Sequence, residues 1–121
     1  MKISIEFFKK QEELRLPIVR LTKSKNYETG TATFIFIKPT LLNLNFYQKI
    51  PIQQISLCWN NKKIITTDLQ IFFYKGNPFL IKAIFIFKNS NEWFQFLNFM
   101  KYYSQETGLF FTEIISTKNN L

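Results

Sequence analysis

Hydrophobic residues recur at every second position through much of this chain, and this alternation constrains its fold more than any other feature. The stretches that show it cover residues 2–8, 18–37, 52–59, 62–74 and 79–87. A period of two residues is typical of β-strands that bury one face. Turn-forming residues separate the strands, at 26–30, Asn60-Asn61 and Gly76-Asn77. The pattern therefore predicts long antiparallel strands joined by tight turns.

A helical period appears once, after the last of these strands. Asn89 or Ser90 can cap the helix, and Glu92 follows Asn89 by three residues, as in a capping box. Gly108 supplies a stop signal. The apolar residues that share one helical stripe are Trp93, Phe96, Leu97, Met100 and Tyr103. We interpret this stripe as core that packs on the sheet.

Together these patterns predict an α+β fold in a single domain over residues 1–112. We expect an antiparallel β-sheet of about five to six strands, with one long C-terminal helix packed on one face. Residues 9–16 are predicted as a connection with one helical turn, and residues 40–49 as a loop. A short strand at 109–112 precedes an expected flexible tail over 113–121.

The composition leaves little material for catalysis. The chain has no histidine, one cysteine (Cys58) and one aspartate (Asp68), so histidine-based metal sites and Ser/His/Asp or Cys/His nucleophile systems cannot be built. Three isolated glycines make no phosphate-binding loop. We therefore predict no catalytic residue, no metal site and no cofactor, and we interpret Cys58 as a small buried hydrophobe.

The net charge of +8 favours acidic partners such as anionic lipid, nucleic acid or acidic protein loops. Lysine outnumbers arginine by 14 to 2, and lysine codons are rich in A and T, so part of this charge reflects codon bias of the kind found in organelle genomes. No apolar run approaches the ~20 residues that span a bilayer. The N-terminus also lacks a signal-peptide core, so we expect a soluble, uncleaved chain.

One face of the hairpin over residues 18–37 carries polar side chains, and these are the candidate partner-binding residues: Arg20, Thr22, Ser24, Thr31 and Thr33. Threonine also suits exposed strand positions, so a merely solvated surface explains the same pattern. Phe34 and Phe36 beside lysines allow a third interpretation, base stacking as in RNA-recognition modules. Those modules alternate strands with helices, however, whereas here the strands run together.

The amino-acid sequence of two separate stretches is more specific than a hairpin and a helix require. The first runs Val-Arg-Leu-Thr-Lys-Ser over 19–24 and Thr-Gly-Thr-Ala-Thr-Phe over 29–34. The second runs Asn-Glu-Trp over 91–93 and continues through Phe99-Met100, Tyr103 and Glu-Thr-Gly-Leu over 106–109. In this order and separation they resemble the photosystem II reaction-centre protein family Psb28. Residues 40–50 depart from the family, because they lack its acidic, serine-rich character, and the whole chain is more basic.

The resemblance implies a non-catalytic photosystem II assembly or repair factor encoded in a plastid. Such a protein would sit peripherally on the stromal side of the thylakoid membrane and dock on the immature reaction-centre complex, protecting its acceptor side. The implied partners are reaction-centre core subunits and the C-terminal tail of the forty-seven-kilodalton chlorophyll-binding inner antenna, which adds to the sheet as a strand. No cofactor and no nucleic acid are expected. A structural subunit of mature photosystem II and, more distantly, a plastid RNA-binding module remain the alternatives.

Overall fold

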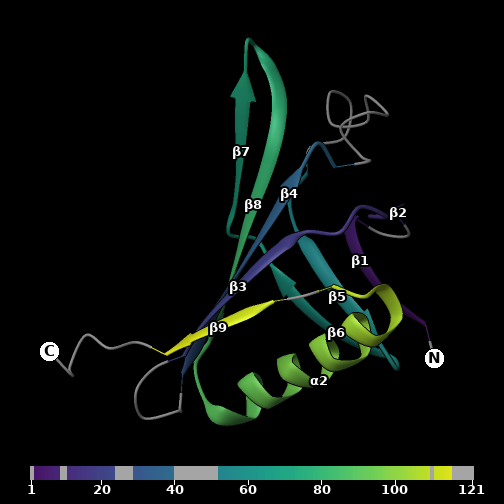
Figure 1. Ribbon diagram of the computed structural model, residues 1–121, viewed down its shortest axis with the longest axis vertical. Helices are drawn as coiled ribbons and strands as arrows, with labels where there is room; N and C mark the ends of the chain where they lie inside the picture. The colour runs from purple at the N-terminus through teal and green to yellow at the C-terminus, as the bar shows by residue number, and fades with distance from the viewer. Residues whose placement is uncertain (1, 9–10, 24–28, 40–51, 110, 116–121) are drawn as a thin grey trace, which may run out of the picture.

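The computed structural model describes residues 2–8, 11–23, 29–39, 52–109 and 111–115 of the chain. These residues form two β-sheets and one long helix, α2 (Figure 1). The first sheet is antiparallel and has the order β2-β1-β5-β6. Its strands are β1 (Ile3–Phe8), β2 (Gln11–Glu12), β5 (Ile55–Trp59) and β6 (Lys62–Thr66).

The second sheet has the order β7-β8-β4-β3-β9. Its strands are β3 (Ile18–Lys23), β4 (Gly30–Ile37), β7 (Leu69–Tyr74), β8 (Asn77–Phe87) and β9 (Thr112–Ile115). Strand β9 runs parallel to β3, whereas the other pairs are antiparallel. The β7–β8 hairpin projects beyond the rest of its sheet (Figure 1).

Aromatic side chains dominate the core, which lies where the two sheets and α2 (Ser90–Thr107) meet. The rings of Phe87 and Phe96 stack with centroids 4.7 Å apart, and those of Trp59 and Phe99 meet edge to face at 5.5 Å. Such pairs add about 0.5–1.5 kcal/mol each beyond the burial of their area. The largest fully buried side chains come from β1, β3, β4, β5, β8 and α2: Trp93, Phe7, Phe34, Phe36, Phe96, Phe99, Ile5, Leu21, Ile55, Leu57, Ile81 and Met100.

Both ends of α2 are fixed by the residues that the sequence indicates. Asn89 is the N-cap, and its side-chain oxygen accepts the backbone N–H of Glu92 at 2.9 Å. The carboxylate of Glu92 accepts the N–H of Lys88 at 2.7 Å, one residue earlier than in a standard capping box. Gly108 ends the helix with φ 78°, a left-handed conformation that favours glycine. In the described part of the chain no helix is both long and apolar enough to span a membrane.

The predicted α+β class and C-terminal helix are confirmed, but the strands of the described residues form two sheets and number nine. The predicted single strand over 62–74 is wrong, because β6 ends at Thr66 and β7 begins at Leu69 in the other sheet. The apolar alternation does not follow one face across this break, because Ile65 is exposed on β6 whereas Leu69 and Ile71 are half-buried on β7. Periodicity does not tell which sheet a strand joins.

Two further predictions about strands need correction. Residues 11–12 form strand β2 instead of a helical turn, because they pair with β1. The last strand lies at 112–115, later than the predicted 109–112, and pairs with β3. The predicted loop at 40–49 lies outside the described residues, as do positions 116–121 of the predicted tail.

Two predictions about side chains also change. Phe99 is fully buried, although it was left out of the predicted helical stripe. Cys58 is half-buried on β5 and is not a core residue. Phe34 and Phe36 are buried in the core, so their rings offer no exposed platform for base stacking.

Candidate partner-binding surface

The hairpin of β3 and β4 brings four of the five predicted partner-binding residues together. Arg20 pairs with Thr33 and Thr22 pairs with Thr31 in the antiparallel register. Directly opposite residues in a sheet share one face, so the four form a compact polar patch on the face away from the core. Arg20 and Thr22 are exposed, whereas Thr31 and Thr33 are half-buried. Ser24, the fifth residue, lies outside the described residues.

The same patch occupies interior strands of the second sheet. Strand β9 pairs with β3 along residues 20–23, and β8 pairs with the whole length of β4. The main chain of this hairpin is therefore already hydrogen-bonded on both sides. A partner can contact the patch only through side chains, and strand addition must occur elsewhere.

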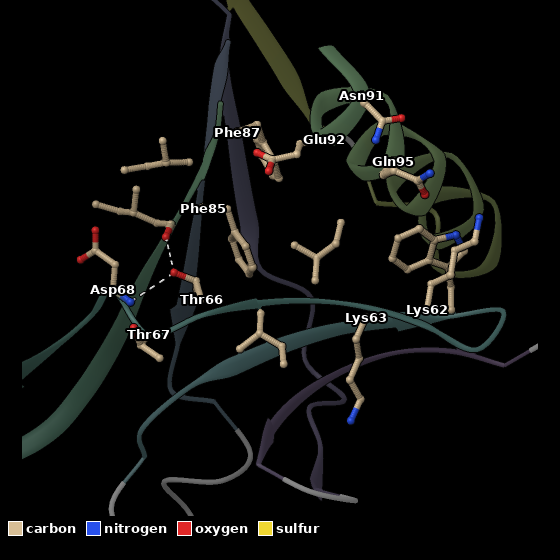
Figure 2. A pocket seen from close by; sticks show the side chains of 15 residues that line it. Lys62, Lys63, Thr66, Thr67, Asp68, Phe85, Phe87, Asn91, Glu92 and Gln95 are labelled. Atoms are coloured by element: carbon tan, nitrogen blue, oxygen red, sulfur yellow. Dashed lines mark hydrogen bonds between the residues drawn. The ribbon is translucent and has the colours of Figure 1, made fainter. Parts of the chain in front are cut away.

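At the C-terminal end of β8, beyond the point where β7 pairs with it, no described strand pairs with the edge that faces away from β4, so we call this edge open. The N–H of Ile84 donates to the carbonyl of Asp68 at 3.0 Å. The Thr66 hydroxyl donates to the carbonyl of Ile84 at 2.6 Å and accepts the N–H of Asp68 at 3.1 Å (Figure 2). In an extended strand, main-chain groups two residues apart point to the same side. The N–H and C=O of Ile86 therefore point away from β4, past the end of β7.

These groups face a groove with a volume of about 780 Å³, between β6, the end of β8 and the first turns of α2 (Figure 2). Phe85, Phe87 and Trp59 give the groove an apolar lining. Lys62 and Lys63 from β6 bring positive charge, and Asp68 and Glu92 bring negative charge. We name this feature the β6–β8 groove. It combines an open strand edge, apolar lining and charges of both signs, as a site for an extended peptide requires.

The sequence interpretation missed this groove, because it arises from the separation of β6 and β7 into different sheets. One signal was present. Thr67-Asp68 interrupts the predicted strand, and aspartate is depleted in strand interiors. A strand boundary at this pair divides residues 62–74 into two strands, as the structure does.

Two titratable side chains among the described residues have raised pKa values. Burial raises the pKa of the Cys58 thiol, and the Glu6 carboxylate raises it further. A raised pKa disfavours the thiolate, which is the nucleophilic form. Burial, and then Glu13 and Glu12, raise the pKa of Tyr103 to about 12. Among the described residues, no cluster of three or more histidine, cysteine or acidic side chains could hold a metal ion.

The fold defines a small α+β domain of two β-sheets and one helix, with a polar sheet face and an open strand edge as its distinctive features. Residues 5–111 match the Psb28 protein family. The chain therefore belongs to the Psb28 family, as the resemblance of the two sequence stretches predicted.

Named relatives agree with this assignment. The photosystem II reaction center Psb28 protein of Pyropia yezoensis is 37% identical over 113 residues, which cover 93% of this chain and 98% of that protein. The protein of the same name from Cyanidioschyzon merolae is 36% identical over 89% of this chain and 95% of its own. The one from Trichormus variabilis is 36% identical over 90% of this chain and 96% of its own.

Proposed function

We propose that this chain is a non-catalytic assembly or repair factor of photosystem II. In this proposal it docks on the stromal face of the immature reaction-centre complex in a plastid and protects the acceptor side. Family membership over nearly the whole chain supports the association with photosystem II, since the relatives are named as photosystem II proteins. The observation that carries the docking mode is the open edge of β8 in the β6–β8 groove.

The β6–β8 groove is suited to receive an extended segment of a partner. A strand added at this edge would hydrogen-bond to the N–H and C=O of Ile86, and its side chains would meet the rings of Phe85 and Phe87. The family resemblance implies that the C-terminal tail of the forty-seven-kilodalton inner antenna adds to the sheet in this way. We therefore assign that tail to the groove.

The polar patch of Arg20, Thr22, Thr31 and Thr33 supplies a second proposed contact, with Ser24 extending the same sequence pattern. These side chains can bind an acidic loop of a reaction-centre core subunit without using the main chain. The patch lies beside the open edge, since Thr31 pairs with Ile86 across β4 and β8, but only β8 borders the groove. Two contacts on neighbouring strands would fix the orientation of the docked protein.

The charge of +8 supports docking on the negatively charged stromal surface, where each lysine or arginine near the surface contributes about 1 kcal/mol. Such attachment is peripheral and sensitive to salt. Raising salt from 0.1 M to 1 M shortens the screening length from ~10 Å to ~3 Å. We therefore expect a high-salt wash to strip the protein from thylakoids, and a requirement for detergent would contradict peripheral attachment.

The docking mode can be tested with a tagged protein and solubilised thylakoids, by measuring how much inner antenna is recovered. Ile86→Pro removes the N–H that points into the groove and leaves the β4–β8 hydrogen bonds in place. Phe85 is already extended, as a residue before proline prefers. We expect this variant to lose the antenna, whereas Ile86→Ala, which keeps the N–H, retains most of it.

Circular dichroism and thermal melting of both variants show whether the fold is intact. Full recovery of the antenna by folded Ile86→Pro would contradict docking at this edge.

Co-migration of the wild-type protein with assembly intermediates supports the assembly role. Co-migration with the mature complex alone would favour the structural-subunit alternative instead.

A further inference from the structure

Among the residues that the structure describes, no third strand lies beside the end of the β7–β8 hairpin. Strand β4 pairs with β8 only as far as Leu80, opposite Ile37. Beyond that point β7 and β8 pair with each other, with one further backbone bond from Lys38 to Phe79, and they project from the body of the protein (Figure 1). We call residues 72–79 the hairpin tip.

The hairpin tip exposes three consecutive aromatic residues. Phe72 is 46% exposed, Phe73 is 62% exposed and Tyr74 is 61% exposed. Large exposed apolar side chains gathered at one end of a hairpin indicate an interaction site. It contrasts with the rest of the sheet, where aromatic rings such as Phe34 and Phe85 are buried and contact one another.

These exposed rings project from both faces of the hairpin tip. Phe72 and Phe73 are neighbours in an extended strand, so their side chains point to opposite sides. The register pairs Phe72 with Leu80 and Phe73 with Pro78, which puts the extra residue of the bulge, Phe79, on the other strand. A partner that covers one face would leave the other aromatic face in water. A medium that surrounds the tip would bury both.

The charges around the tip are all positive. Lys75 lies over the ring of Tyr74 at 5.4 Å, and Lys38 lies over the ring of Phe79 at 5.7 Å. The backbone N–H of Lys38 also donates to the carbonyl of Phe79 at 2.8 Å, which ties this lysine to the hairpin. No acidic residue occurs between positions 69 and 87. Aromatic rings with lysines at their margins are typical of segments that enter the headgroup region of a membrane.

We propose that the hairpin tip inserts into the headgroup region of a lipid bilayer that contains anionic lipids. Phe72, Phe73 and Tyr74 enter the boundary between headgroups and acyl chains, while Lys38 and Lys75 bind the anionic headgroups. Three residues of strand span about 10 Å, which matches the ~5–10 Å depth of interfacial segments. This contact needs no protein partner, so it is independent of the docking proposed above.

The tip and the β6–β8 groove can be occupied at the same time. They lie at opposite ends of β8, and the nine residue steps from Asn77 to Ile86 correspond to about 30 Å of extended strand. Lipid contact at the tip would hold the protein at the membrane surface and leave the groove open to a partner.

Flotation of the purified full chain with lipid vesicles tests this inference. The vesicles contain equal parts of phosphatidylglycerol and phosphatidylcholine, and pure phosphatidylcholine vesicles serve as the neutral reference. We expect binding to the anionic vesicles, and a loss of about tenfold or more in Phe73→Ser with Lys75→Ser. The matched control is Phe94→Ser with Lys101→Ser on α2, because Phe94 is 61% exposed and Lys101 is exposed. The control should bind as the wild type does.

A second measurement locates the tip in the bilayer. The native tryptophans Trp59 and Trp93 are buried, at 2% and 0% exposure. Only the tryptophan introduced by Phe73→Trp should therefore be quenched by brominated lipids. Equal vesicle binding by the tip variant and the wild type would overturn the proposal, as would a lack of quenching. A third result would also overturn it. If the wild type did not bind the vesicles and the tip variant no longer recovered photosystem II, the tip would contact protein and not lipid.

Discussion

Gly30 lies directly against the indole ring of Trp93, and a β-carbon at this position would overlap ring atoms Cε3 and Cζ3. Gly30 begins β4, and Trp93 is in the first turn of α2. The two sequence stretches that carry the family resemblance therefore meet in the core. Some of the residues that resemble the family are therefore explained by the packing of the helix on the sheet. Only the side chains that point outward are available to contact a partner.

The contact predicts that Gly30→Ala is destabilising for lack of space. Overpacking of a core of this kind typically costs about 1–3 kcal/mol. Urea denaturation of the variant measures this loss in the free energy of unfolding. In a Trp93→Leu background the ring is gone, so the same glycine substitution should cost much less. An equal cost in both backgrounds would show that the indole is not the cause.

Thr66 holds the point where the chain passes from one sheet to the other. Its hydroxyl bridges the carbonyl of Ile84 and the N–H of Asp68, as Figure 2 shows. Thr66→Val keeps the shape but removes both hydrogen bonds, so we expect a loss of about 1–3 kcal/mol in the free energy of unfolding. Thr67→Val is the control, because Thr67 is exposed. Hydrogen exchange should show faster exchange of the Asp68 amide, which donates to the Thr66 hydroxyl, in Thr66→Val, and unchanged exchange would contradict the bridging role.

Tyr103 predicts how stability depends on pH in the alkaline range. Its pKa is raised from the ordinary value of 10 to about 12, chiefly by burial and then by Glu13 and Glu12. Because the pKa is raised in the folded state, neutral Tyr103 contributes to the free energy of unfolding. This contribution is fully present below pH 10 and is lost as the pH rises through 12. Tyr103→Phe has no proton to lose, so its stability should fall less over this interval. Denaturant midpoints of both proteins at several pH values measure the difference, and parallel curves would contradict the assignment.

The helix and the hairpin could be predicted from the sequence because their signals are local. Asn89 and Gly108 mark the helix ends through their own hydrogen bonds and backbone angle. The hairpin follows from the alternation on either side of residues 26–30, although the exact pairing does not, because Gly30 already pairs with Lys23. The polar patch is therefore a local consequence of one hairpin.

The division into two sheets could not be predicted in the same way. It depends on which strands pair, and those contacts join residues far apart in sequence, such as Ile5 with Leu57. Ile65 and Ile71 follow one alternating pattern, yet they belong to different sheets. The β6–β8 groove is a product of that division. It depends on the hydrogen bond between Thr66 and Ile84, which are 18 positions apart in the sequence.

The polar patch provides the last prediction, which concerns partner contact. Replacing Arg20 and Thr22 together with alanine should change the free energy of unfolding by no more than about 0.5 kcal/mol, because both side chains are exposed. In an interface, loss of an arginine that pairs with an acidic loop can cost about 2 kcal/mol or more. We therefore expect the double variant to fold normally and to recover much less photosystem II intermediate from solubilised thylakoids.

Lys101→Ala with Gln105→Ala is the matched control, because it removes one cation and one polar side chain from the exposed face of α2. This control should recover the intermediate as the wild type does, which separates a local contact from a general loss of charge. If the folded Arg20 and Thr22 double variant also recovers it fully, the patch is a solvated surface. The interface would then rest on the β6–β8 groove, and Ile86→Pro should be the only one of these variants to lose the antenna.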